Sequence, residues 1–141
     1  MNINVYSSVA ISPDGSKIVF RFDNQLYFRN INQLDAIPLQ GTTNAGTPFF
    51  SPDNRWIGFF ADGKLKKIST GGGTPVILAD AGDNRGATWG RKGDIVFSGI
   101  TTTGLMMVKE SGGVVKELTT LNKERNERTH RWPRPEMPRL P

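Results

Sequence analysis

The sequence predicts an all-β fold, namely a partial β-propeller of about three four-stranded antiparallel blades. A Ser-Pro-Asp turn followed by an apolar strand occurs at 11–20 and at 49–60, and an eroded copy occurs at 89–97. The first two copies are 39 residues apart, measured from Ser12 to Ser51. A fixed period near 40 residues with hairpin signals throughout is typical of propeller blades, each of which contains four short strands.

The second copy organises the rest of the prediction. Pro52 presets φ at the first turn position, and Ser51 and Asp53 have oxygens that accept hydrogen bonds from nearby backbone N–H groups. Asn54 tolerates the left-handed conformation that closes such a turn. Residues 56–60 are apolar at every position, so we expect both faces of this strand to be covered.

The first blade is predicted from its turns and from its β-favouring residues. A Pro-Asp-Gly turn separates its first two strands, Asp23-Asn24 forms a tight reversal, and the third strand is aromatic. Pro38 in the last strand fits a sheet edge, where a missing N–H donor costs little. The four expected strands are 9–11, 18–22, 25–29 and 35–39.

The second and third blades repeat this plan after a crossing at 40–47 that is rich in Gly, Thr and Asn. Hairpin turns at 61–64 and 70–74 have glycine where φ is expected to be positive. The expected strands are 48–50, 56–60, 65–69 and 75–79 in the second blade, and 87–89, 94–98, 105–109 and 114–118 in the third.

These elements place the blades at about 1–44, 45–83 and 84–122. Residues 123–141 then begin a fourth blade at 129–132 and continue as a basic tail, whose last nine residues include four prolines and should be extended or disordered. Propellers close with about four to eight blades. We therefore expect the chain to be a piece of a larger ring, or a subunit that completes one by association.

Composition excludes several classes of site. The 141-residue chain has no cysteine, which rules out disulfides and thiolate metal sites. It has no apolar stretch near the ~20 residues that span a bilayer and no signal pattern at its start. Of the net charge of +5, three charges lie in the tail at 123–141, so the blades are nearly balanced.

The Ser-Pro-Asp-Gly turn followed by Ile-Val-Phe resembles the TolB-type, WD-like β-propeller repeat. A narrower resemblance is to the propeller that lies C-terminal to many bacterial eukaryotic-like serine/threonine kinases, and it covers roughly residues 5–133. The residues that carry it are Pro-Phe-Phe-Ser-Pro-Asp at 48–53, Trp-Ile-Gly-Phe-Phe-Ala-Asp-Gly-Lys-Leu-Lys-Lys at 56–67, Arg-Gly-Ala-Thr-Trp-Gly at 85–90 and Arg-Thr-His-Arg-Trp-Pro at 128–133.

This resemblance implies a non-catalytic propeller that lies beyond a transmembrane segment, on the extracytoplasmic (periplasmic) side of a bacterial membrane, and binds partners or ligands. The kinase itself is absent, because the chain has neither a glycine-rich phosphate loop nor a His-Arg-Asp segment. The family pattern also stops after Trp132. A truncated gene or an altered reading frame would produce that departure.

Other motifs favour structural roles, so we expect no cofactor, no metal and no catalytic residue. Residues 71–73 form a glycine run without the Lys-Ser/Thr of a phosphate loop, and we interpret it as a hairpin turn. Residues 80–84 lack calcium-loop spacing and form an inter-blade loop. His130 has no Gly-x-Ser-x-Gly partner motif and is expected to pack beside Trp132.

We interpret the aspartates of the repeated turns as turn-forming and not as a catalytic pair. The tryptophans at 56, 89 and 132 are expected to pack structurally, with the alternative that one of them lines a binding face. The lysines within 64–67 are expected on a strand face or turn. The residues selected as the repeat-turn motif are Ser12, Pro13, Asp14, Gly15, Ser51, Pro52, Asp53 and Asn54.

The sequence therefore predicts a non-catalytic interaction or sensor module, whose partner docks on rim loops that include 40–47 and 80–86. The alternative is the propeller portion of a serine peptidase or another propeller-containing enzyme whose catalytic domain is not in this chain. A nucleic-acid partner is not expected. Because the tail is basic, this alternative predicts retention on DNA that depends steeply on salt concentration. An open array leaves two blade faces bare, which predicts self-association.

Overall fold

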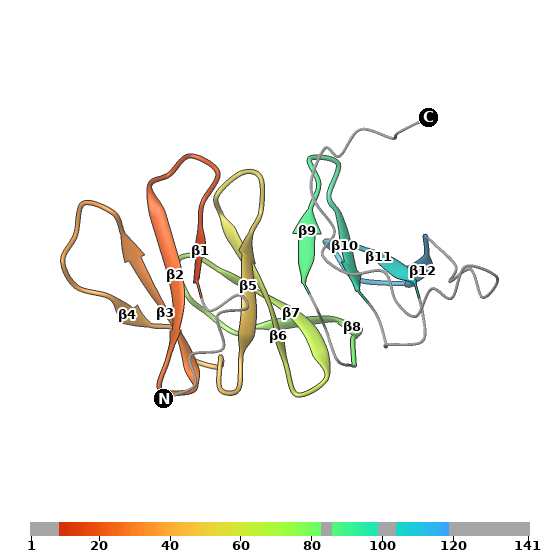
Figure 1. Ribbon diagram of the computed structural model, residues 1–141, viewed down its shortest axis with the longest axis horizontal. Coiled ribbons are helices and arrows are strands. Elements are labelled where there is room, and N and C mark those ends of the chain that lie inside the picture. The colour runs from red at the N-terminus through yellow and green to blue at the C-terminus, as the bar shows by residue number, and fades with distance from the viewer. Residues whose placement is uncertain (1–8, 83–85, 99–103, 119–141) are drawn as a thin grey trace, which may run out of the picture.

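The computed structural model describes residues 9–82, 86–98 and 104–118. Across those ranges it contains twelve strands in three four-stranded antiparallel sheets and no helix, and hence no helix that could span a membrane. The strands of each sheet follow one another in chain order, and the three sheets stand side by side (Figure 1). The predicted fold class is confirmed.

Each predicted strand corresponds to one observed strand. The first sheet contains β1 (Val9–Ile11), β2 (Lys17–Phe22), β3 (Gln25–Asn30) and β4 (Ile37–Pro38). The second contains β5 (Gly46–Phe50), β6 (Trp56–Ala61), β7 (Lys64–Ser69) and β8 (Val76–Asp80). The third contains β9 (Ala87–Trp89), β10 (Asp94–Ser98), β11 (Leu105–Lys109) and β12 (Lys116–Glu117).

The main differences from prediction lie at the sheet margins. Strands β4 and β12 are only two residues long, whereas the sequence predicted 35–39 and 114–118. Each is an outermost strand that pairs on one side only, and Pro38 cannot donate to a ladder. Strand β5 begins earlier than predicted, at Gly46, because a β-bulge between Gly46 and Phe49 with Thr47 at φ 47° lets pairing with β6 continue.

The β2–β3 and β6–β7 hairpins turn through two residues with positive φ. These are Asp23 and Asn24 at 48° and 65°, and Asp62 and Gly63 at 53° and 74°. Two positive φ values in succession match the right-handed twist of the flanking strands. Short polar residues and glycine meet this requirement at low cost, so the sequence specifies both reversals.

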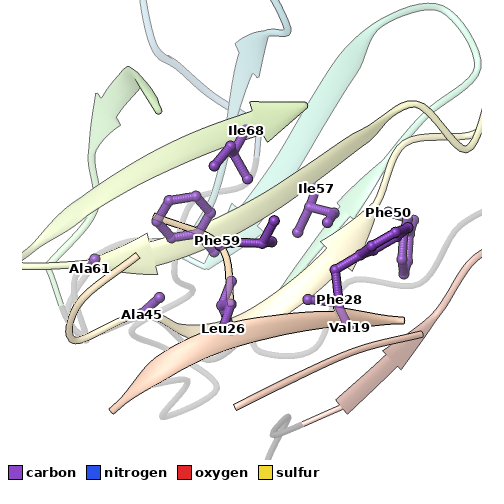
Figure 2. Close-up of a cluster of buried hydrophobic side chains, with 10 residues drawn as sticks. Val19, Leu26, Phe28, Ala45, Phe50, Ile57, Phe59, Ala61 and Ile68 are labelled. Atoms are coloured by element: carbon purple, nitrogen blue, oxygen red, sulfur yellow. The ribbon is translucent and has the colours of Figure 1, made fainter. Parts of the chain in front are cut away.

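The core between the first and second sheets is aliphatic and aromatic (Figure 2). Leu26 of the first sheet, with Val19 beside it, faces Ile57 and Phe59 of β6, and all four side chains are fully buried. At the end of the sheets near the β2–β3 turn, Asn24 Nδ2 donates to Asn44 Oδ1 at 2.6 Å, which ties the crossing at 40–47 to the first sheet.

A second core lies between the second and third sheets. Phe60 of β6 contributes to it, together with Leu65 of β7 and with Ile95 and Phe97 of β10. Phe59 and Phe60 are neighbours in the chain, and they point into different cores because successive side chains of a strand lie on opposite faces. Both faces of β6 are therefore covered, as the unbroken apolar run predicted.

Gly58 of β6 lies directly beneath the Phe49 ring, and an added Cβ would overlap that ring. We expect Gly58→Ala to displace Phe49 and to lower the free energy of unfolding by about 1–3 kcal/mol, as overpacking does. Urea unfolding measures the change. Gly46→Ala is the matched control, because its Cβ would lie an ordinary 3.8 Å from Arg21 Nη1. Equal midpoints for the two variants would contradict this packing.

Candidate functional site

The candidate site lies where three hairpin turns reach the same edge of the molecule. These are the β1–β2, β5–β6 and β9–β10 turns, which all point to the top of Figure 1. They come together because the first strands of neighbouring sheets touch, β1 against β5 and β5 against β9. The three repeats therefore place their equivalent turns around one surface.

A serine hydroxyl closes each of the first two turns. Lys17 N donates to Ser12 Oγ at 3.0 Å, and Ser12 Oγ in turn donates to Asp14 Oδ1 at 2.7 Å. In the second turn, Trp56 N donates to Ser51 Oγ at 2.9 Å. Ser51 Oγ then donates to Asp53 Oδ1 at 2.5 Å, and Arg55 N donates to the same oxygen at 3.1 Å.

These hydrogen bonds stabilise the charged form of both carboxylates. Donation from Ser12, then from Ser16, lowers the pKa of Asp14 to about 2. Donation from Ser51 is the main cause that lowers the pKa of Asp53. A general base works best with a pKa near the operating pH, and the pKa values of these two carboxylates are lowered away from it. Because both carboxylates are already bonded within their own turns, they are suited to holding the turns.

The first two turns are also joined to each other. Asp14 N donates to Asn54 Oδ1 at 3.1 Å, a contact between residues 40 positions apart in the chain. Asn54 adopts φ 64°, as the sequence predicted, and Gly15 adopts φ 75° at the same place in the first turn. Asparagine at this position therefore closes its own turn and bonds the neighbouring one.

The third turn is held differently, because Gly90 stands at the serine position and has no hydroxyl. Lys109 Nζ forms an ion pair with Asp94 Oδ1 at 2.5 Å. Trp89 Nε1 donates to Glu110 Oε2 at 3.0 Å, which fixes the indole ring. The eroded turn thus relies on the neighbouring hairpin for support.

Between the second and third turns lies an open groove of about 660 Å³. It is lined by Phe49 and Phe50 of β5, by Pro13 and Pro52, and by residues 87–92 and Asp94. The rings of Phe49 and Trp89 meet edge to face with centroids 6.2 Å apart. Arg91 and Lys92 are exposed beside this aromatic surface. The groove therefore combines apolar walls with a cationic margin.

The structure places the other predicted residues apart from the groove. Trp56 packs against the second core, with Lys67 Nζ 4.5 Å from the centroid of its ring. Residues 71–73 lie in the β7–β8 hairpin, and Lys64 forms an ion pair with Asp80. In the described part of the chain, no three His, Cys, Asp or Glu side chains are grouped to hold a metal.

Several predicted features lie outside the described residues: positions 83–85 of the inter-blade loop, His130, Trp132 and the basic tail at 123–141. The predicted docking loop at 40–47 lies at the start of β5, whereas the groove lies at its end. Sequence reasoning did not find the groove. The signal was present in Trp-Gly-Arg-Lys-Gly at 89–93, a copy of the turn that keeps the aromatic residue but replaces Ser-Pro-Asp.

Comparisons with solved structures support the fold. The chain resembles the putative TolB of Agrobacterium tumefaciens with a TM-score of 0.67 at 17% identity, over 80% of this chain and 45% of that one. It resembles a chain of a nidogen/laminin complex with a TM-score of 0.65 at 16% identity, over 78% and 46%. For Kuenenia stuttgartiensis hydrazine synthase the TM-score is 0.66 at 8% identity, over 82% and 36%.

Identities this low show the fold alone, which is that of TolB-type β-propellers. The chain spans less than half the length of each of these three proteins. Neither known family models nor curated proteins give a match to the sequence. Since one of the three proteins is named as an enzyme, the fold by itself does not separate binding propellers from enzyme-associated ones.

The hydrogen bonds to Asp14 make stability depend on pH. The pKa of Asp14 is about 2 in the folded chain against an ordinary value of 3.8. Its stabilisation is therefore complete above the unfolded pKa and is lost as pH falls through the folded one. We expect Asp14→Asn to lower the urea midpoint at about pH 6, and we expect this deficit to close between about pH 4 and pH 2.

Asp35→Asn is the control, because Asp35 is an exposed carboxylate of the β3–β4 connection. A deficit for Asp14→Asn that stays constant down to about pH 2 would show that the carboxylate charge does not hold the turn.

Proposed function

We propose that the chain is a propeller module that binds a protein partner through a short extended segment, in the groove between the second and third turns. The observation that carries the proposal is the meeting of aromatic walls and exposed cations in one concave surface. Concave sites with mainly apolar walls and a few polar groups are the usual form of binding sites. The nidogen/laminin complex in the comparison is itself a protein assembly.

The groove suits a peptide-like ligand with one large apolar side chain and an acidic group. Phe49 offers apolar area, the buried Phe50 and Trp89 lie behind it, and Pro13 and Pro52 add rigid walls. Lys92 lies at the exposed margin, where a charge mainly steers association and sets orientation.

We further propose that this module belongs to a larger protein of the kinase-linked type. The support is the sequence resemblance at 48–53, 56–67, 85–90 and 128–133. The flanking sequence of the gene tests the setting, because a kinase domain and a membrane span upstream would support it. A flanking sequence without a kinase would contradict it.

An enzyme-associated propeller is the second candidate function. Hydrazine synthase, which this chain resembles in fold, is the observation that favours it. In that setting the chain would contribute a binding or gating surface to a catalytic domain located elsewhere. A catalytic domain encoded beside this one would favour this candidate over a stand-alone interaction module.

Selection of random displayed peptides on the immobilised full chain tests the groove. We expect the selected peptides to combine a large apolar residue with an aspartate or glutamate. Lys92→Glu should weaken their binding about three- to tenfold, the range typical of a charge at the margin of an interface. Fluorescence titration of labelled peptides measures the affinities.

Lys116→Glu is the matched control, because Lys116 is an exposed lysine of the outermost strand β12 and does not line the groove. If Lys92→Glu and Lys116→Glu weakened binding equally, or if no peptide were selected, the groove would not be the binding site.

A further inference from the structure

The first sheet has an apolar face that no other described part of the chain covers. We call it the leading face, since it points away from the second sheet. Val19 and Leu26 lie on the opposite face, in the core. Strand pairing places these side chains together on the leading face: Val9, Ile11, Ile18, Phe20, Phe22 and Tyr27. Of these, Val9, Ile11 and Phe22 are 57%, 61% and 63% exposed.

The same positions are buried in the other two sheets. Counting from the turns, Ile18 corresponds to Ile57 of β6 and to Ile95 of β10, both of which are 0% exposed. Likewise Phe20 corresponds to Phe59 and Phe97, which are 0% and 1% exposed. The leading face of the first sheet thus repeats the pattern of two faces that are covered.

In both covered cases the partner is the opposite face of the preceding sheet, which we call its trailing face. For the second sheet, Val19, Leu26 and Phe28 of the first sheet provide this cover. On the third sheet, Val96, Leu105 and Met107 occupy the matching trailing positions and are half-buried. The surface that fits the exposed leading face is therefore another trailing face of this repeat.

We propose that a second copy of this chain supplies that trailing face. The leading face of the first sheet in one copy packs on the trailing face of the third sheet in the other. The second contact joins the same two faces with the roles of the copies exchanged. Two copies then make a closed ring of six sheets. Propellers contain about four to eight blades, so the three sheets described in one copy are too few for a ring and nine would be too many.

The lengths of two of the structurally similar chains agree with two copies. The chain covers 45% of the Agrobacterium tumefaciens TolB chain and 46% of the chain in the nidogen/laminin complex. Two copies therefore approach the length of one such chain. A closed two-fold ring also leaves no unpaired face that would continue into filaments.

Charges on the two faces are complementary. Arg29 pairs with Ile18 across the first sheet and stands where β7 has Ile68 and β11 has Val108. Its Nε is buried and has no hydrogen-bond partner within the described residues. On the trailing face of the third sheet, Asp94 occupies the position that Trp56 has in the second sheet. Trp56 packs against the core that includes Val108, the residue equivalent to Arg29. The ring thus places Arg29 of one copy near Asp94 of the other, where it would share that carboxylate with Lys109.

Sedimentation of the full chain over a concentration series tests the ring. We expect a species of twice 15.6 kDa at high concentration. Phe22→Glu on the leading face and Met107→Glu on the trailing face should each weaken dimerisation at least about tenfold. Leu34→Glu is the matched control: Leu34 is 94% exposed but lies outside both faces, so its substitution should leave the dimer intact.

Mixing the two variants tests the direction of packing. A mixed dimer has one contact in which both faces are unchanged, so Phe22→Glu and Met107→Glu chains should dimerise better together than either does alone. Circular dichroism checks folding. Thr88 pairs with Val96 and so lies on the same trailing face, and Thr88→Glu replaces Met107→Glu if that variant unfolds. A monomer at high concentration, a dimer insensitive to Phe22→Glu, or a pair of variants that does not rescue in the mixture would overturn the proposal.

Discussion

Phe59 and Phe60 are adjacent in β6, yet one packs against the first sheet and the other against the third. The fold depends on this arrangement. A four-stranded sheet with apolar side chains on both faces is stable only when both faces are covered, and removing one buried phenylalanine side chain costs about 3–5 kcal/mol. The second sheet satisfies this condition through its two neighbours, while each neighbour needs a further layer on its outer side.

Polar groups then fix how the stacked sheets align. At one end, Ser12 and Ser51 close the first two turns, and Asn54 bonds the backbone of Asp14. At the other end, Asn24 bonds Asn44 of the crossing segment. Burial supplies most of the stabilising free energy, because an individual hydrogen bond contributes about 0.5–1.5 kcal/mol net. The hydrogen bonds instead select one register between neighbouring sheets.

Local patterns in the sequence were sufficient to predict the strands, because Pro52, Asn54 and the apolar run at 56–60 each specify their own conformation. The bulge at Thr47 was not predictable, since it depends on pairing with β6 and is not marked by a turn signal. The groove was missed for a related reason. It depends on how far apart the second and third turns lie. The sequence around Gly90 indicates only that this turn has no serine hydroxyl to close it.

Native-state hydrogen exchange on the full chain tests the central role of β6 most directly. Amides of β6 and of its partner β7 should exchange most slowly and together, because opening them requires separation of both cores. Amides of the two-residue strands β4 and β12 should exchange fastest among the strands. If the amides of β2 or β10 were protected well beyond those of β6, the sheets would be stable independently, and the central position of Phe59 and Phe60 would not govern the fold.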